Sequence, residues 1–213
     1  MPTSTFPVLL GLVFVLIGKH CFSQTEDSIR YFDENYHPIT KETFDQKRYF
    51  GGTFIGIRGD SIHHTILAYR KIRGTIANKS SLDSLLADAT NTRIDPEKPI
   101  VVIYYPGKDN CNSTGTTNRK KFGKQYDRLE KRIDRIQKSH IFYIYKDKEG
   151  LYDRYDGFKT WIADPQGIFE KTFFSRHYPC SSEVVISPSG KFISSRGESD
   201  LMDIIQMIKD LKE

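Results

Sequence analysis

The stretch PIVVIYYPGKDNC, residues 99–111, carries the strongest structural signal in this chain of 213 residues. Its first part, PIVVIYY, is a continuous apolar run, which is typical of a strand buried on both faces of a sheet. The polar loop PGKDNC follows and ends in Cys111. Next comes a charged segment with helical periodicity. The sequence therefore predicts a central strand, a cysteine-bearing loop and a helix, in that order.

The C-terminal half alternates predicted strands and helices. After the cysteine loop, apolar residues recur at helical steps and indicate an amphipathic helix; they are Phe122, Tyr126, Leu129, Ile133 and Ile136. The remaining predicted elements are a strand at 140–145, a short helix beginning at Asp164-Pro165, a hairpin at 183–198 and a terminal helix at 199–212. The order from residue 99 is β-α-β-α-β-β-α. Since strands joined through a helix are usually parallel neighbours, the sequence predicts an α/β sheet with an antiparallel hairpin at one edge.

The N-terminal half predicts a smaller unit. Two β-rich runs, 53–57 and 62–72, are separated by turn residues and predict a hairpin. The segment 80–91 has the apolar spacing of a short helix, and a proline-bearing linker follows it. We therefore expect a small extension of hairpin plus helix, residues 24–98, before a main domain, residues 99–213.

The apolar block FPVLLGLVFVLIG, residues 6–18, predicts export. It is shorter than the run of about 20 apolar residues that crosses a bilayer, and it has the length of the apolar region of a secretory signal peptide. Cys21 and Ser23 supply the small residues before a cleavage site at Gln24, so the predicted signal peptide is 1–23. The alternatives are an uncleaved membrane anchor and a lipid-modified Cys21. The sequence predicts a secreted or periplasmic protein, which meets the membrane only through this segment if the segment is retained.

The charge pattern does not indicate a nucleic-acid partner. The formal net charge is +5, and the densest basic run, 118–135, is interleaved with acidic residues. Since a nucleic-acid face needs a one-sided basic patch, this run is interpreted as a solvated helix face. A copper or zinc site made of Cys111, His177 and Cys180 is chemically possible, but the spacing His177-x-x-Cys180 alone is a weak signal. We expect no metal and no cofactor.

The order of elements over about 99–213 resembles the thioredoxin-like superfamily, whose redox members exchange thiols and disulfides. IVVIYYPGKDNC resembles the segment in which that family carries its redox cysteine, just past the first strand and at the start of the first helix. YPCSSEVVISPSGKFISSRGE, residues 178–198, resembles its proline loop, strand, turn and strand. The chain departs from the family at two points. Cys111 is followed by Asn-Ser-Thr, so the second cysteine of Cys-x-x-Cys is absent, and Pro179 lies about two residues before the family's cis-proline place, near Ser181.

The resemblance implies that the loop of Cys180 approaches the loop of Cys111. Three alternatives follow: a structural disulfide, a redox pair in which Cys111 attacks and Cys180 resolves, and two independent cysteines. In the redox pair, a place at a helix N-terminus would lower the pKa of the Cys111 thiol. The loop residues expected to support the two candidate catalytic cysteines are Pro106, Asp109, Pro179 and Ser181. Two functions stay open: a degenerate thiol–disulfide oxidoreductase acting on an unidentified protein or thiol partner, and a non-catalytic binding or scaffold protein that retains only the fold.

Overall fold

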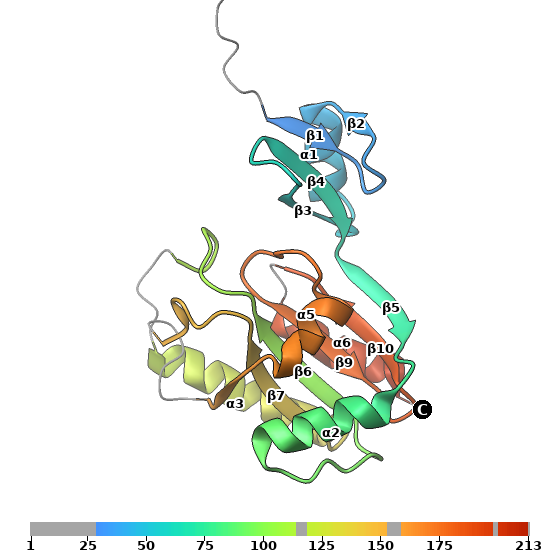
Figure 1. Ribbon diagram of the computed structural model, residues 1–213, viewed down its shortest axis with the longest axis vertical. Helices are drawn as coiled ribbons and strands as arrows, with labels where there is room; N and C mark the ends of the chain where they lie inside the picture. Colours follow the sequence, from blue (N-terminus) through green and yellow to red (C-terminus); the bar gives the residue numbers. More distant parts are fainter. Residues whose placement is uncertain (1–28, 114–118, 153–158, 198–199, 213) are drawn as a thin grey trace, which may run out of the picture.

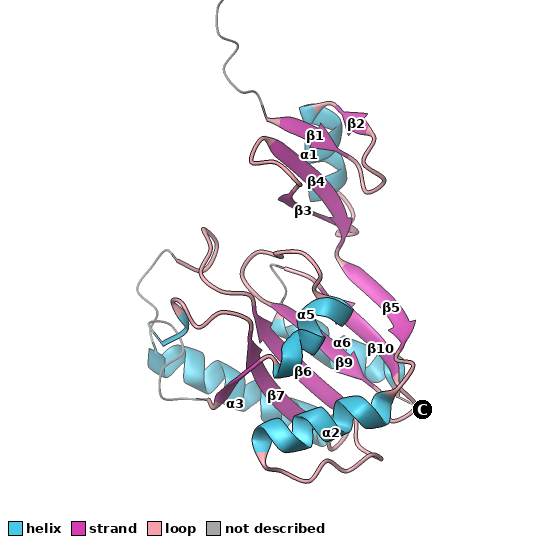
Figure 2. Cartoon of the chain, in the orientation of Figure 1, coloured by secondary structure: helices cyan, strands magenta, loops and turns pink. Residues whose placement is uncertain are grey.

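The computed structural model describes residues 29–113, 119–152, 159–197 and 200–212 (Figure 1). The predicted signal peptide, residues 1–23, lies outside the described residues. The strands form a four-stranded sheet in the order β2-β1-β4-β3 and a six-stranded sheet in the order β5-β10-β9-β6-β7-β8. Figure 2 shows the smaller sheet at one end of the molecule and the larger sheet layered between helices.

The large sheet is built around β6 (Ile100–Tyr105), and all residues of this strand are buried. On one side β6 runs parallel to β7 (His140–Tyr145), which in turn runs parallel to β8 (Trp161–Ala163). On the other side it is antiparallel to β9 (Ser182–Ile186), which forms a hairpin with β10 (Lys191–Ser195). The central buried strand and the late hairpin predicted from the sequence are therefore confirmed.

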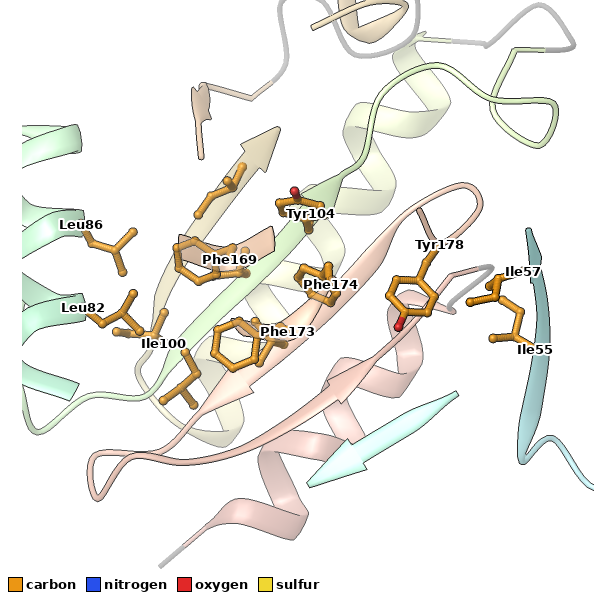
Figure 3. Packing of buried hydrophobic residues seen from close by; sticks show 14 of the residues in the cluster. Ile55, Ile57, Leu82, Leu86, Ile100, Tyr104, Phe169, Phe173, Phe174 and Tyr178 are labelled. Carbon is orange, nitrogen blue, oxygen red and sulfur yellow. The ribbon is translucent and has the colours of Figure 1, made fainter. Parts of the chain in front are cut away.

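Helices cover both faces of this sheet. One face packs against α3 (Arg119–Ile136) and α6 (Leu201–Leu211). The other packs against α2 (Lys79–Thr90) and α5 (Ile168–Phe173), whose buried side chains are seen in Figure 3. Because successive side chains of a strand point to opposite faces, the continuous apolar run of β6 supplies both layers of the core.

The arrangement of these elements is thioredoxin-like. Its core is β6-α3-β7-α5-β9-β10-α6, with β10-β9-β6-β7 as the order of neighbouring strands. The first two strands are parallel, the last two form the antiparallel hairpin, and the helices divide between the two faces. The predicted fold class, α/β and thioredoxin-like, is confirmed. The chain adds α2 to one face, β8 to one edge, and β5 (Lys71–Thr75) to the other edge.

Asp164 marks the start of the helical segment after β8, as the sequence predicts. A 3₁₀ turn (Pro165–Gly167) comes first and leads into α5. The carboxylate of Asp164 accepts hydrogen bonds from the backbone N–H groups of Phe169 (3.0 Å) and Glu170 (2.8 Å), which belong to the first turn of α5. Burial raises the pKa of this carboxyl group, and the two N–H donors oppose the rise.

The small sheet is formed by the N-terminal residues. Its strands are β1 (Arg30–Phe32), β2 (Pro38–Ile39), β3 (Phe54–Arg58) and β4 (His64–Tyr69), and α1 (Lys41–Tyr49) contacts β1 and β3. β3 and β4 are antiparallel neighbours, so the predicted hairpin is confirmed.

The segment 24–98, which we expected to form one extension, is divided between the two sheets. Only Arg70 separates β4 from β5, and β5 pairs with β10 of the large sheet. Leu82 and Leu86 of α2 are 4% and 0% exposed because they pack in the core beneath that sheet. Sequence spacing alone predicts neither partner, since both contacts join residues far apart in the chain.

The small sheet packs against the loop that precedes β9. Ile55 of β3 belongs to the same buried cluster as Tyr178 of that loop (Figure 3). Arg176 of the loop forms an ion pair with Asp60 (3.4 Å) and a hydrogen bond with the hydroxyl of Tyr36. The small sheet with α1, residues 30–69, is called the N-terminal unit below. Its contacts therefore stabilise the position of the loop that carries Cys180.

Gly197 lies where the N-terminal unit packs closely against the loop that precedes β9. Its φ of +58° is a conformation that favours glycine, and an added Cβ would lie 2.7 Å from Cδ1 of Ile55 and 2.9 Å from Cδ of Pro179. We expect Gly197→Ala to lower the free energy of unfolding by about 3 kcal/mol, from backbone strain and overpacking together. The matched control is Gly52→Ala, where φ is +63° and no atom lies within 4 Å, so only strain of about 1 kcal/mol is expected. Equal losses in urea unfolding of the two variants would contradict this packing.

His140 links the start of β7 to the loop before β6. Its Nε2 accepts a hydrogen bond from the backbone N–H of Asp95 (2.8 Å), which requires a neutral ring with its proton on Nδ1. Burial, followed by the charge of Lys98, lowers the pKa of His140 below its usual value, although the carboxylates of Asp95 and Asp83 oppose this. The unfolded chain therefore binds this proton more readily than the folded chain does.

The consequence is a loss of stability as the pH falls through about 6.5, where a histidine of the unfolded chain becomes protonated. We expect the urea midpoint of the wild type to fall more between pH 7.5 and 5.5 than that of His140→Gln. The glutamine oxygen can replace Nε2 as the acceptor but does not titrate in this range. If the urea midpoints of the two proteins fell equally between pH 7.5 and 5.5, His140 would make no contribution to the pH dependence of stability.

Candidate functional site

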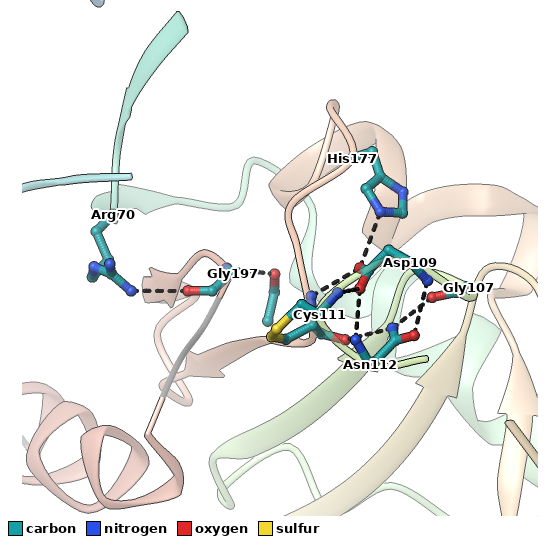
Figure 4. Close-up of a disulfide and its surroundings, with 9 residues drawn as sticks. Arg70, Gly107, Asp109, Cys111, Asn112, His177 and Gly197 are labelled. Carbon is teal, nitrogen blue, oxygen red and sulfur yellow. Dashed lines mark hydrogen bonds and ion pairs between the residues drawn. A yellow bond between two sulfur atoms is a disulfide. The ribbon is translucent and has the colours of Figure 1, made fainter. Parts of the chain in front are cut away.

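Cys111 and Cys180 are joined by a disulfide (Figure 4). Their Cα atoms are 5.1 Å apart, although 69 positions separate them in the chain. Cys111 is exposed in the turn after β6, and Cys180 is half-buried in the loop before β9. The alternative of two independent cysteines is therefore excluded, while the structural and redox-active alternatives both need a disulfide at this place.

The carboxylate of Asp109 holds both halves of the disulfide. Its Oδ1 accepts hydrogen bonds from the backbone N–H groups of Cys111 (2.8 Å) and Asn112 (2.9 Å). Its Oδ2 accepts from the backbone N–H of Cys180 (2.9 Å) and lies 3.2 Å from Nε2 of His177. The side chain of Asp109 is 12% exposed, and its bonds to Asn112 and Cys180 are partly buried, whereas those to Cys111 and His177 lie at the surface. Asp109 is thus a non-covalent clamp between the same two loops that the disulfide joins.

Asn112 provides a second connection that we did not predict from the sequence. Its Oδ1 accepts from the backbone N–H of Asp109 (2.8 Å), and its Nδ2 donates to the carbonyl oxygens of Gly107 (2.8 Å) and Cys180 (3.3 Å). The residue is 8% exposed. The Asp-x-x-Asn spacing around Cys111 signals such a turn, because the side chains of Asp and Asn readily bond to nearby backbone groups. The contact with Cys180 has no sequence signal.

Cys111 lies in a turn that begins at Asp109. The carboxylate of Asp109 accepts hydrogen bonds from the N–H groups of residues 111 and 112, and its backbone carbonyl oxygen accepts from the N–H of Ser113 (2.9 Å). An N-cap residue makes bonds of this kind to the first turn of a helix. The described part of α3 begins at Arg119, and residues 114–118 lie outside the described residues. The helix N-terminus at Cys111 that the family resemblance implies therefore stays a prediction.

The backbone corner in the second loop is made by Cys180. Its φ is +69°, an uncommon conformation for a residue with a side chain. Both of its backbone polar groups are held, the N–H by Asp109 and the carbonyl by Asn112, and this fixes the conformation. No peptide bond among the described residues is cis, so Pro179 is trans and does not reproduce the cis-proline of the family.

The other predicted supporting residues flank this centre. Pro106 is buried directly after β6, Pro179 is half-buried, and Ser181 is half-buried immediately before β9. Pro179 lies against Gly197, the glycine that also contacts β3. The predicted supporting residues lie in the two loops that the disulfide joins, and the side-chain contacts between these loops come from Asp109, which is one of them, and from Asn112.

A groove of about 710 Å³ opens beside Cys111. One wall of the groove comes from the N-terminal unit and is lined by Arg48, Gly56 and Arg58. The other wall comes from the two cysteine loops and is lined by Lys108, His177 and Pro179. The N-terminal unit therefore does not cover the disulfide but forms one side of its approach.

No three histidine, cysteine, aspartate or glutamate residues in the described part of the chain gather in a way that would hold a metal ion. None of the helices in this part has the length and apolar character needed to cross a membrane.

Comparison with known proteins adds little to this description. Neither a protein-family model nor a curated protein matches the chain. Among solved structures, it is similar to an exposed lipoprotein thioredoxin from Streptococcus pneumoniae, with 14% sequence identity and a TM-score of 0.38. The match covers 59% of this chain and 90% of that one. At this level of similarity the fold assignment depends on the strand order and helix layers described above.

Proposed function

We propose that this is an exported thioredoxin-like protein whose Cys111–Cys180 disulfide exchanges with thiols of a partner. The observation that carries the proposal is that one cysteine of the disulfide is accessible beside a groove. Cys111 is exposed and lines the groove, whereas Cys180 is half-buried. Thiol–disulfide exchange needs a sulfur that an incoming thiolate can reach. A partner thiolate would attack Sγ of Cys111, and Cys180 would leave as the thiolate.

The same groups can run the exchange in the opposite direction. In the reduced protein, the Cys111 thiolate attacks a partner disulfide and forms a mixed disulfide. Cys180 then attacks Cys111 and releases the partner as a thiol. This second step requires the two cysteines to remain neighbours when no bond joins them. The clamp of Asp109 on the backbone of both residues supports that requirement.

The alternative is a non-catalytic binding or scaffold protein in which the disulfide is structural. The observation that favours it is the stretch Cys-Asn-Ser-Thr at Cys111, which lacks the second cysteine of the Cys-x-x-Cys motif of the family's redox members. The reduction potential separates the two functions. A potential below about −300 mV indicates a stable structural bond, and a less negative one supports exchange.

Insulin reduction by the reduced protein is the direct test. We expect the wild type to reduce insulin in the presence of dithiothreitol and Cys111→Ser to lose this activity, because the attacking thiol is gone. Cys180→Ser should instead accumulate a mixed disulfide through Cys111, since the resolving thiol is missing. A wild type without activity above the dithiothreitol background, together with a potential below about −300 mV, would leave only the structural alternative.

Export is supported by the apolar block at 6–18 and by a disulfide, which persists chiefly in oxidising compartments. We expect the protein expressed with residues 1–23 to be recovered outside the cytoplasm with Gln24 as its first residue. An intact N-terminus on the exported protein would indicate an anchor, and a lipid on Cys21 would indicate a lipoprotein.

A further inference from the structure

β3 is an edge strand with unused pairing capacity. It lies at the end of the small sheet and pairs only with β4 among the described strands. Residues of an antiparallel strand alternately direct their backbone groups toward the partner strand and away from it. The bonds from Gly59 N–H to His64 (2.8 Å) and from Arg70 N–H to Thr53 (2.8 Å) fix this alternation. Gly56 and Arg58 therefore direct their N–H and C=O groups away from β4.

This open edge borders the groove beside the disulfide. Gly56 and Arg58 line the groove together with Cys111, His177 and Pro179. An extended segment that pairs with β3 would therefore run past the exposed residue Cys111. Addition of a strand to an open edge is a common way for proteins to bind peptides, because the main chain supplies the affinity.

The charge of the groove selects the kind of segment. Arg48 from α1, Arg58 from β3 and Lys108 from the cysteine loop all line it, and Lys108 also forms an ion pair with Glu149 (3.9 Å) outside the groove lining. Asp109 is the one carboxylate among the described lining residues, and its oxygens are already occupied by hydrogen-bond donors. Such a surface attracts acidic chains and disfavours basic ones.

We propose that the partner of the Cys111–Cys180 disulfide is an extended acidic segment that carries a cysteine and adds a strand to β3. This inference rests on the proposed function. The cysteine thiolate of the segment attacks Sγ of Cys111, the Cys111–Cys180 bond breaks, and a Cys111–segment bond forms. Cys180 leaves with the electron pair and takes up a proton. One disulfide is exchanged for another, so the step needs no additional oxidant or reductant.

The test uses the full oxidised protein and synthetic peptides with one central cysteine. Two peptides differ only in their flanks, which are acidic in one and basic in the other. Each rate of mixed-disulfide formation is divided by the rate of the same peptide with a small uncharged disulfide, which corrects for intrinsic thiol reactivity. We expect the acidic peptide to react about tenfold faster at low salt. The preference should largely vanish at about 0.5 M salt. Equal corrected rates at low salt would overturn the proposal.

Charge reversal in the groove tests whether the preference for the acidic peptide arises there. Arg58→Glu is expected to reduce the acidic-to-basic rate ratio at least about threefold. Arg93→Glu is the matched control: it makes the same charge change at an exposed loop residue before β6, at the end of that strand opposite the Cys111 loop. An equal loss in both variants would mean that only the net charge of the protein matters, and this would overturn the assignment to the groove.

Peptide backbone methylation tests strand pairing without altering the protein. Two acidic peptides carry N-methyl groups on alternate residues, one on the odd and one on the even positions. Only one set of N–H groups can face β3, so one peptide should lose about tenfold in rate while the other keeps the parent rate. Unchanged rates for both peptides, or equal losses, would overturn the pairing with β3.

Two further reagents separate this inference from the proposed function. Dithiothreitol is small and uncharged, so its reaction with the disulfide reports exchange alone. Suppose that dithiothreitol reduces the disulfide and the reduction potential lies above about −300 mV, while the corrected acidic and basic peptide rates are equal. The proposed function then stands, and the inference of an acidic strand fails. A small anionic thiol, mercaptosuccinate, should show less rate enhancement than the acidic peptide. Equal enhancement would mean that the groove selects a charge and not an extended segment.

Discussion

Replacement of Cys111 and Cys180 together by serine is expected to lower the free energy of unfolding by about 4 kcal/mol. The two cysteines are 69 positions apart, and a cross-link of that span removes much of the conformational entropy of the unfolded chain. For a protein of this size the loss corresponds to a fall in melting temperature of roughly 8–16 °C. Thermal and urea unfolding of the double variant and the oxidised wild type measure it.

The reduced wild type provides the control for this prediction. It retains both cysteine side chains but lacks the cross-link, so its stability should match that of the double serine variant within about 1 kcal/mol. A reduced wild type as stable as the oxidised protein would show that the bond contributes nothing to the folded state. A double variant much less stable than the reduced wild type would instead indicate a packing role of the thiols.

Removal of the Asp109 carboxylate is expected to cost about 3 kcal/mol in the oxidised protein. Asp109→Ala leaves three backbone N–H groups without their acceptor, and those of Asn112 and Cys180 are partly buried, where water replaces the lost bonds poorly; the third is that of the exposed Cys111. Asp109→Asn is the graded control, since it keeps one acceptor oxygen and should lose about half as much. Urea unfolding of the three oxidised proteins gives the comparison.

The same variants should also change the redox equilibrium. In reduced Asp109→Ala the two loops can separate and expose their N–H groups to water, whereas the disulfide prevents this in the oxidised protein. The loss of stability is therefore larger when the bond is present, and the potential should become less negative by about 30 mV for each 1.4 kcal/mol of difference. An unchanged potential, or equal losses in both redox states, would show that Asp109 does not hold the cysteines together.

The sequence predicts those features of the fold that depend on local pattern. The apolar run of β6, the apolar stripe of α6 and the turn between β9 and β10 each carry a direct signal, and all three elements form where expected. Their order then limits the topology, because parallel strands joined by helices have few alternatives. The thioredoxin-like layers follow from these constraints.

The contacts of the candidate site cannot be predicted from local sequence pattern. Asp109 bonds to Cys180, and Arg58 faces the groove of Cys111, across long stretches of sequence. The family resemblance implies that the loops of Cys111 and Cys180 approach each other, and the disulfide joins them. It does not predict the hydrogen bonds of the Asp109 carboxylate to the backbone N–H groups of residues 111 and 112. Those bonds depend on a side chain at a position where the family pattern requires no particular residue.

The pairing of β5 with β10 has a consequence for how the protein is made. β5 ends at Thr75 and β10 begins at Lys191, so the ribosome releases the outer strand long before its partner exists. At ordinary rates of translation the delay is on the order of ten seconds. During this time the nascent chain presents an unpaired strand, a surface that favours association between chains. The large sheet can close at this edge only after β10 has been synthesised.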